Sequence, residues 1–482
     1  MSSVPMTFLF KKKRTNISYL ILLACFLCFS LPLTCYATAS PNVENKGIIS
    51  FNTPNTVYTI SSDIDLHGQT VNIASNCSLY FNGGSFSNGM IIGKNTRIVA
   101  PFGKIFNSNV NLKGTFCSDK ILISWWTTVG INDNTKEVQQ ALNSILLFSN
   151  RIVLFDVPVR ITDVEFVLKW YPGVKFLGVS NSYQNKASIT VFGTKSQGLD
   201  ISGTENLRFE NILFEGCEND PPRTLLFASR CVDNKQCQGH HFKDVNFYGR
   251  VTSAFVYNYA GELWHFQDCS FRLSKTSICK TLFYGTSINS LGLLSKFGQT
   301  ETNTTPFTCT YFTGTTFSNI TSCPSTIFEG GKNSSGKLRN TASICFDKCY
   351  FYTPKSTTAK FYNVQGAITF QNSVDESGAD SNAEGNDPLY EFTGDIQIQG
   401  ITFFNNTIYS RKNSCIIDSN ASVRNYTGQS NYIINANAKW RFNQLYDSRH
   451  YGLSTTEFFC VLGKNSNVIV EGGKSSHVSV KK

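Results

Sequence analysis

The sequence predicts an all-β chain: a single-stranded right-handed parallel β-helix, in which short strands stack coil upon coil, with one short capping helix. Two observations predict this fold. A six-residue segment ending in phenylalanine recurs along the chain, whereas apolar residues at helical spacing occur at one place, near residue 140. Self-similarity on a scale of roughly 20 to 50 residues is typical of solenoids, whose repeats bury their apolar faces against each other.

The recurring segment has six positions. The first is apolar, the third is usually Asn, Asp or Gly, the fourth is small or β-branched, the sixth is Phe, and the second and fifth vary. The third position carries residue types that tolerate a left-handed backbone, so we expect a bend there between two short strands. The fourth and sixth positions then share one face of the second strand. The phenylalanines are predicted to form buried ladders. The seven segments are FNGGSF from Phe81, FENILF from Phe209, FKDVNF from Phe242, FQDCSF from Phe266, FTGTTF from Phe312, FDKCYF from Phe346 and IQGITF from Ile398.

The spacing of the segments gives the size of one coil. Starts at positions 209, 242, 266, 312, 346 and 398 are separated by 33, 24, 46, 34 and 52 residues. The two largest gaps are near twice the smallest, which predicts a diverged coil inside each of them. A coil of roughly 22 to 30 residues is the scale of a β-solenoid repeat.

One helix is predicted at residues 135–149. The segment Asn134 to Glu137 has the pattern of a capping box, in which the first side chain caps the helix and the fourth reaches back. Such a helix covers an end or a side of a solenoid and shields strand edges there. The apolar residues at helical spacing are Val138, Ala141, Leu142, Ile145 and Leu146.

The N-terminus has the pattern of an export signal. Four basic residues at 11–14 precede an apolar run at 19–33, and Ala37 and Ala39 give the small-x-small pattern of a cleavage site. We therefore expect residues 1–39 to be a signal peptide and the mature protein to be secreted, or held at the cell surface or in the periplasm, with no membrane span. Two alternatives stay open: an uncleaved anchor, and a lipobox that ends at Cys25.

The remaining chain is divided into 40–118, N-terminal β-helix coils; 119–150, a connecting strand and the capping helix; and 151–482, the main β-helix. The sequence leaves the oligomeric state undetermined.

Removal of the signal peptide takes away four basic and no acidic residues, so the formal net charge falls from +10 to +6. A charge this small, without a run of like charges, argues against nucleic-acid binding and is compatible with an anionic polysaccharide. Thirteen of the sixteen cysteines remain, at irregular spacing, and we expect them to be mostly unpaired and buried.

These residues resemble the pectate-lyase superfamily, in the form found in secreted proteins of gut Bacteroidota. The resemblance lies in residues 81–89 (FNGGSFSNG), in the tract Gly130 to Thr135 ahead of the helix and in VKFLGVS from Val174. The tract departs from the family's GDGxxDDT, because its central Asp-Gly is lost and Asn134 replaces the second paired aspartate. The resemblance implies a pectin-lyase-like solenoid, and it is specific for architecture rather than for activity.

Members of that superfamily cleave polysaccharides by elimination or by hydrolysis. Elimination needs a base and positive charge or Ca²⁺ beside a uronate carboxylate, whereas hydrolysis needs two carboxylates across the bond. Three of the six histidines fall between positions 215 and 275, so this segment is the predicted site. Its candidate catalytic residues are Asp220, Asp233, His240 and His241; its candidate substrate-binding residues are Arg223 and Arg230, for a substrate carboxylate, and Tyr257 and Tyr259, for stacking on sugar rings.

The sequence therefore favours a polysaccharide-active protein, a lyase or glycoside hydrolase of uronate-containing glycans. The alternative is a β-helix that binds carbohydrate, or builds a surface structure, without catalysis. One of His240 and His241 is expected to point inward and the other to lie on a solvated strand face, because they are adjacent on a strand. Asp244 and Asp268 occupy the turn position and are expected to be structural. No metal ligand set is evident, and the cofactor is undetermined, with Ca²⁺ one candidate if the protein is a lyase.

Overall fold

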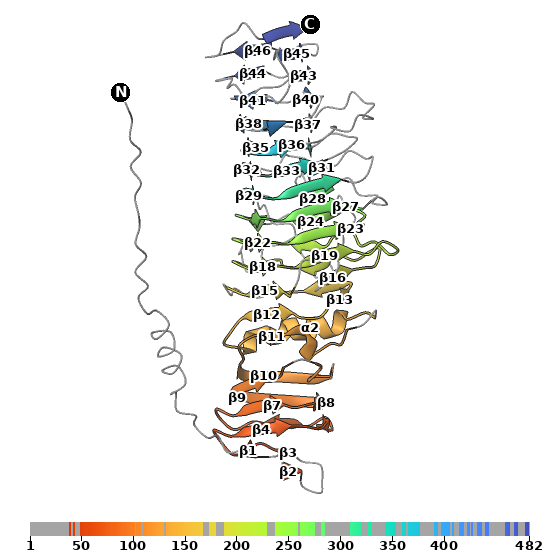
Figure 1. Cartoon of the computed structure of the whole chain (residues 1–482), viewed down its shortest axis with the longest axis vertical. Coiled ribbons are helices and arrows are strands. Elements are labelled where there is room, and N and C mark those ends of the chain that lie inside the picture. Colours follow the sequence, from red (N-terminus) through yellow and green to blue (C-terminus); the bar gives the residue numbers. More distant parts are fainter. Residues whose placement is uncertain are drawn as a thin grey trace, which may run out of the picture.

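The computed structural model describes residues 49–375, with gaps at 102, 108, 130–131, 167–172, 180–187, 229–236, 259–260, 275–280, 285–308, 320–325, 330–342, 353–358 and 363–364, and strand backbones outside that range. Strands make up 53% of the structure and helices 7%. The strands lie across one long axis and stack along it (Figure 1). Among the described residues, no helix has the length and apolar character needed to cross a membrane.

The N-terminal strands form a parallel sheet of their own. Along one edge of it, Asn95 donates from Nδ2 to Oδ1 of Asn76 at 2.8 Å, and Asn76 donates to Asn55 at 3.3 Å. All three have positive φ, so asparagine supplies the turn and ties successive turns together. The sheet contains β1 (Thr38–Ala39), β4 (Val57–Ile60), β7 (Ser78–Phe81), β9 (Gly89–Val99), β10 (Val110–Cys117) and, beside β9, β6 (Thr70–Asn72); the flanking pairs are β2 (Asn42–Val43) with β3 (Ile49–Ser50), which is antiparallel, and β5 (Ile64–Asp65) with β8 (Phe86–Ser87).

Three long parallel sheets follow, and the chain visits them in turn, so that neighbours within a sheet come from successive passes. The eleven-stranded sheet contains β11 (Ile121–Leu122), β12 (Ile152–Phe155), β15 (Lys175–Gly178), β18 (Arg208–Glu210), β22 (His241–Lys243), β26 (His265–Gln267), β29 (Thr310–Thr313), β32 (Ser343–Asp347), β35 (Gln365–Gln371), β38 (Gln397–Phe404) and β42 (Tyr426–Thr427). The nine-stranded sheet contains β13 (Val159–Ile161), β16 (Ser188–Val191), β19 (Leu213–Gly216), β23 (Asn246–Gly249), β27 (Ser270–Leu273), β30 (Thr316–Asn319), β33 (Tyr350–Tyr352), β36 (Val374–Asp375) and β39 (Thr407–Ile408).

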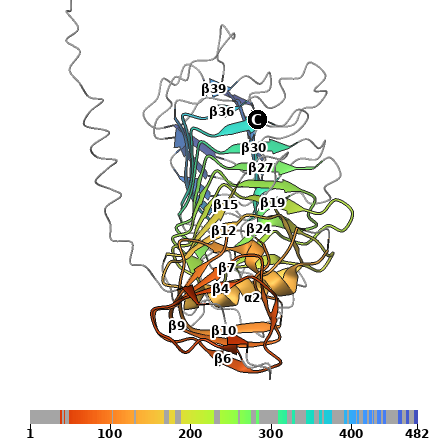
Figure 2. The same cartoon turned by 60° about the horizontal axis from the view of Figure 1, so that its bottom comes forward.

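The twelve-stranded sheet completes each pass. It contains β14 (Asp163–Glu165), β17 (Gly198–Asp200), β20 (Leu226–Ala228), β24 (Ala254–Asn258), β28 (Thr281–Tyr284), β31 (Thr326–Glu329), β34 (Ala359–Tyr362), β37 (Tyr390–Thr393), β40 (Ser414–Asp418), β43 (Asn431–Asn435), β45 (Phe458–Leu462) and β47 (Val478–Lys481). Two small parallel sheets are also present: β21 (Cys237–Gln238) with β25 (Gly261–Glu262), and β41 (Ser422–Arg424) with β44 (Lys439–Phe442) and β46 (Asn467–Val470). In the second, β41 and β44 contact β38 and β42 of the eleven-stranded sheet. The turned view in Figure 2 shows the strands of successive passes one above another.

Phenylalanines fill the space between the three long sheets. In the eleven-stranded sheet, the inward rings from Phe176 to Phe370 stack in one column with centroids 4.6 to 5.0 Å apart. A second column in the nine-stranded sheet includes Phe247 and Phe271, whose centroids lie 4.7 Å apart. Edge-to-face contacts join the two columns, as between Phe266 and Phe271 at 5.5 Å. The template phenylalanines of the first six segments, which the structure describes, are therefore buried, as the repeat predicted.

The third template position adopts the left-handed backbone in each of the first six segments, which confirms the predicted bend. The φ angles lie between +52° and +95°. Asp244 and Asp268 are among these turn residues, as the template predicted. The six residues are Gly83, Asn211, Asp244, Asp268, Gly314 and Lys348.

Residues with a hydroxyl or thiol recur at the fourth template position because their side chains donate a hydrogen bond to the preceding pass. Thr315 donates from Oγ1 to the carbonyl of Phe266 at 3.1 Å, and the thiol of Cys269 donates to the carbonyl of Phe242 at 3.4 Å. Each bond joins a turn to the first phenylalanine of the preceding pass. These cysteines therefore act as small buried hydrogen-bond donors. Cys349 and Ser373 make the same contact, with Phe312 and Phe346.

The structure corrects the register of the seventh segment. Phe403 pairs with Phe370 in the eleven-stranded sheet, so it occupies the first template position and not the sixth. The pass that was missed begins at Phe370 and turns at Asn372, which has a φ of 50°. It is the diverged repeat expected in the 52-residue gap. The 46-residue gap holds none, because Phe266 pairs directly with Phe312 and the extra residues lengthen the connections.

The predicted helix is present but shorter and capped differently. Helix α2 spans Thr135–Ser144 and continues as the 3-10 turn η2 (Ile145–Leu147); a second 3-10 turn, η1 (Ile123–Trp125), precedes it. The side chain of Asn134 does not cap the helix. It accepts from the backbone N–H of Arg160 at 3.0 Å and donates to Thr127 Oγ1 at 2.8 Å, while Asp133 accepts from the N–H of Thr135 at 2.8 Å. Asn134 thus ties the helix start to β13.

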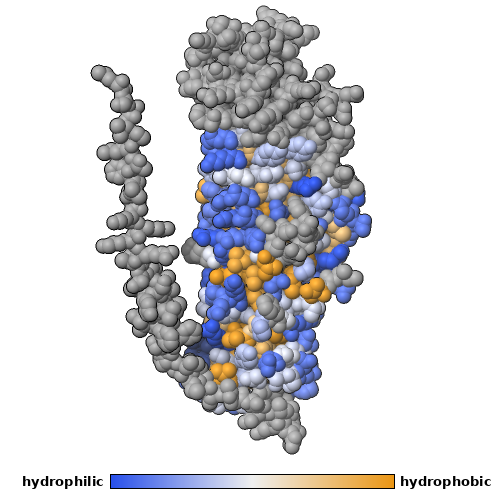
Figure 3. All heavy atoms as spheres, in the orientation of Figure 1, coloured by the Kyte–Doolittle hydropathy of each residue, from blue (hydrophilic) through white to orange (hydrophobic). Residues whose placement is uncertain are grey.

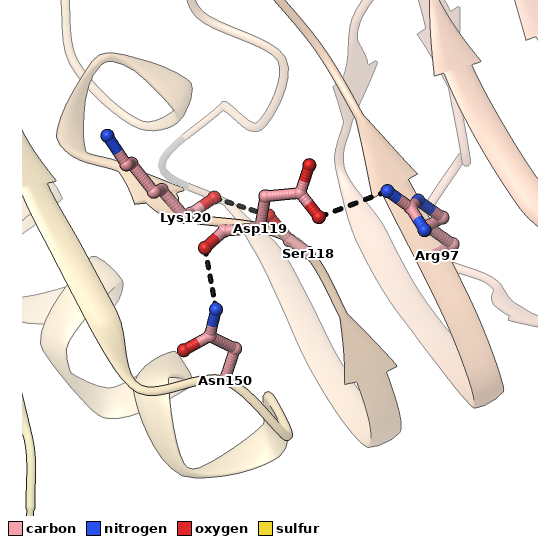
Figure 4. A network of polar contacts seen from close by, with 5 residues as sticks. All are labelled: Arg97, Ser118, Asp119, Lys120 and Asn150. Atoms are coloured by element: carbon pink, nitrogen blue, oxygen red, sulfur yellow. Dashed lines mark hydrogen bonds and ion pairs between the residues drawn. The ribbon is translucent and has the colours of Figure 1, made fainter. Parts of the chain in front are cut away.

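A polar network joins the N-terminal sheet to the segment after the helix (Figure 4). Arg97 of β9 forms an ion pair with Asp119 at 3.0 Å. Asn150, which lies between η2 and β12, donates to the backbone carbonyl of Asp119 at 2.6 Å. The backbone between β10 and β11 is therefore held from both sides.

Candidate functional site

His240 is a core residue and cannot work at the surface, which corrects its assignment as a candidate proton-transfer group. It is fully buried, and its ring meets that of Trp264 edge to face at 5.2 Å. Its Nδ1 accepts from the N–H of Leu207 at 3.1 Å, so the ring hydrogen lies on Nε2, which faces Cys237 Sγ at 2.9 Å and Thr204 Oγ1 at 3.4 Å. Burial lowers the pKa of His240 to about 3, and His241 adds to the shift.

Tyr257 is also buried. The side chain of its neighbour Val256 belongs to the core, and that of Tyr257 points to the other face of the strand. There its ring stacks on the ring of Phe227, on the neighbouring strand, with centroids 4.7 Å apart. A ring with no exposed surface offers no platform for a sugar in this structure, which corrects the expectation for Tyr257. Tyr259, Asp233 and Arg230, the other predicted site residues from this region, lie outside the described residues.

Asp220 and Arg223 lie on the connection between β19 and β20. The carbonyl of Asp220 accepts from the N–H of Gly193, and the backbone N–H of Arg223 donates to Ser196. Both residues are partly exposed. The connection leads from the nine-stranded to the twelve-stranded sheet, whereas His241 belongs to the eleven-stranded sheet. Of the predicted site residues that the structure describes, Asp220 and Arg223 therefore lie apart from His241, and the other two are buried.

His241 points outward and belongs to a column that the sequence analysis missed. Strand pairing places it directly beside Arg208 on one side and His265 on the other, and His265 is paired with Tyr311. Each of these residues precedes an inward phenylalanine, so each side chain points away from the core. We call these four residues and the next one, Cys345, the outer column; Tyr311 pairs with Cys345.

The rings of the outer column stack. The imidazoles of His241 and His265 lie with centroids 4.8 Å apart and planes 11° from parallel, and His265 lies 4.8 Å from the ring of Tyr311, at 23°. Arg208 and His241 are exposed, and the remaining members are partly exposed. The three rings thus form one continuous stack that runs across successive strands, with the ring faces turned toward one another and the ring edges turned outward.

Charged side chains flank the column. Lys175 lies beside Arg208 in the sheet and forms an ion pair with Glu210 at 2.6 Å, and Lys243 is exposed two residues after His241. This end of the column is cationic, because Arg208 is always charged. Figure 3 shows mainly polar side chains over one face of the described surface, with apolar side chains gathered at its middle and lower levels.

The environment keeps the column's rings neutral near pH 7. Partial burial lowers the pKa of His241, and the charge of Arg208 lowers it further. Partial burial and then His241 lower the pKa of His265. Burial is also the main cause that raises the pKa of Tyr311. The stack therefore presents uncharged ring edges with a guanidinium at one end.

The column thus offers polar ring edges and one guanidinium to a ligand. A guanidinium binds a carboxylate through two parallel hydrogen bonds. The signal that would have located the column is the residue just before each repeated phenylalanine: Arg208, His241, His265, Tyr311 and Cys345.

In the described part of the chain, no three or more His, Cys, Asp or Glu side chains gather as they would around a metal ion. Searches among protein-family models, curated proteins and solved structures find no match to this chain. The structure defines the class of the protein: an all-β protein of stacked parallel sheets, with three stacked rings in its outer column.

Proposed function

We propose that the chain is a right-handed parallel β-helix of the pectate-lyase type. Three observations support this proposal: the chain visits three parallel sheets in a fixed order, left-handed turns recur at one template position, and stacked phenylalanines fill the interior. Right-handed crossovers between parallel strands are strongly favoured by strand twist. With its N-terminal export pattern, the protein acts outside the cytoplasm, as a secreted or surface protein.

Its function in this proposal is to bind uronate-containing polysaccharide along the outer column. The observation that carries the proposal is the stack of His241, His265 and Tyr311 next to Arg208. Strands in a sheet are about 4.8 Å apart, so the column offers a contact at each step along the long axis. A linear glycan lying parallel to that axis would meet one ring edge per pass, with a carboxylate at the guanidinium.

Binding of polygalacturonate oligomers, measured by isothermal titration calorimetry, tests the proposal. Tyr311→Ala and Arg208→Gln should each weaken binding about tenfold, the equivalent of about 1.4 kcal/mol. The matched control is Thr313→Ala, because Thr313 lies two residues after Tyr311 on the same strand, exposed but outside the column. A neutral glucan should bind more weakly than polygalacturonate. Equal binding by wild type and both column variants would refute the proposal.

Cleavage of such a glycan is the second candidate function, and one carboxylate favours it. Burial raises the pKa of Glu329 to about 6, although Thr281 donates to it at 3.4 Å and lowers the pKa in part. A carboxylic acid with a pKa near the working pH can transfer protons in catalysis. Glu329 lies in the twelve-stranded sheet, so the site would differ from the outer column.

An activity screen separates cleavage from binding alone. Purified protein is incubated with pectins and glycosaminoglycans, with and without added Ca²⁺, and unsaturated products are read by ultraviolet absorbance and new reducing ends by colour. Loss of activity in Glu329→Gln would support this site. Activity retained in Glu329→Gln but lost when Asp220 and His241 are replaced would favour the site predicted from the sequence. Binding without cleavage would leave the protein a carbohydrate-binding β-helix.

A further inference from the structure

The two stacked histidines are coupled to each other by their geometry. Their rings are 4.8 Å apart and nearly parallel, and they come from paired positions of adjacent strands, so neither ring can move away without breaking the stack. Charging both would place two positive charges one ring spacing apart, which is unfavourable in a partly buried site. Without a ligand, the pair therefore holds few protons near neutral pH.

The surroundings of the pair determine which ligands could reverse this. Arg208 lies beside His241 and disfavours its protonation, and Tyr311 covers the other side of His265. A bound carboxylate would partly neutralise the guanidinium and attract a proton to the nearest imidazole. Other titratable groups lie on the elements packed around the pair. They are Lys175 with Glu210, Lys243, buried His240, Cys345 and Asp347, the turn residues Asp244 and Asp268, and Glu205 and Glu262, three positions before Arg208 and His265.

We propose that an anionic glycan bound at the outer column draws one proton onto the His241–His265 pair, so that its affinity rises as the pH falls from 7.5 to 5.5. This inference rests on the proposed binding function and adds its regulation by pH. One proton is expected and not two, because the first imidazolium opposes a second charge on the stacked ring. Uronate carboxylates stay ionised over this range, so the ligand itself does not supply the pH dependence.

Calorimetric titration with a galacturonate hexamer between pH 5.5 and 7.5 tests the coupling. Uptake of one proton gives an affinity that rises up to about tenfold for each unit of pH decrease. Titration in two buffers of different ionisation enthalpy measures the proton uptake directly. The double variant His241→Gln with His265→Gln should bind with little pH dependence, whereas the control His67→Gln, a replacement of an exposed histidine paired with Asp65, should keep the wild-type slope.

The outcomes separate the inference from the function on which it rests. Binding by the wild type with no pH slope and no proton uptake would overturn the coupling and leave the binding function in place. A slope that persists in the double variant would overturn the role of the two histidines. Failure of the wild type to bind at any pH would overturn both proposals.

Discussion

Acidification is expected to destabilise this protein through one buried histidine. The ring of His240 is fully buried, its Nδ1 accepts from Leu207, and its pKa is lowered to about 3. In the unfolded chain a histidine titrates near pH 6.5. The folded state therefore binds fewer protons than the unfolded state between these two values, and stability falls as the pH falls through that window. A proton on Nδ1 would also break the hydrogen bond from the Leu207 N–H, because two N–H donors would then face each other.

The size of the effect follows from the two pKa values. From pH 6.5 to pH 5 the unfolded histidine gains its proton while the folded one does not, and each pH unit is worth about 1.4 kcal/mol. The free energy of unfolding should therefore drop by about 2 kcal/mol between pH 7 and pH 5. For a protein with a total stability of about 5 to 15 kcal/mol, such a loss is readily measured.

Urea unfolding at pH 7, 6 and 5 measures this dependence. His240→Asn removes the titrating ring but keeps an acceptor near the position of Nδ1 for the Leu207 N–H. The variant should be less stable than wild type at pH 7, yet lose about 2 kcal/mol less on going to pH 5. His67→Asn, in which an exposed histidine is replaced, should keep the wild-type dependence. If His240→Asn and wild type lost stability in parallel, the reasoning from burial would be wrong.

Three further predictions concern packing, backbone and thiols. Phe247→Ala removes a ring stacked at 4.7 Å on one neighbour and should lower the free energy of unfolding by about 3 to 5 kcal/mol; an unchanged urea midpoint would contradict the register. Gly249→Ala should lower the melting temperature more than Gly83→Ala, as measured by differential scanning calorimetry. Both glycines have positive φ, but a Cβ at Gly249 would lie 2.3 Å from a carbonyl oxygen, whereas a Cβ at Gly83 would meet nothing within 4 Å. Cys269 and Cys349 should resist thiol reagents in the native protein and react once it is denatured, because burial raises both pKa values, that of Cys349 to about 12; rapid labelling of native protein would count against this.

Part of the site was accessible from the sequence by local rules alone. An inward Phe242 requires the residue before it to point outward and the one before that to turn inward, and His241 and His240 do so. Applied to each repeat, the same rule would have identified the outer column. Residue type and closeness in sequence group Asp220 with His240, although the two lie in different parts of a pass.

The sequence by itself determined the features that depend on a few consecutive residues. Left-handed turns at Asp244 and Asp268 and buried phenylalanines at fixed offsets follow from backbone sterics and from period-two alternation. The tertiary structure decided what depends on contacts between passes. It paired Phe266 with Phe312 across a long connection, shifted Phe403 to the first template position and buried Tyr257. The physical reason is that loop length changes closure entropy only slowly, so register is set by which rings stack and not by spacing along the chain.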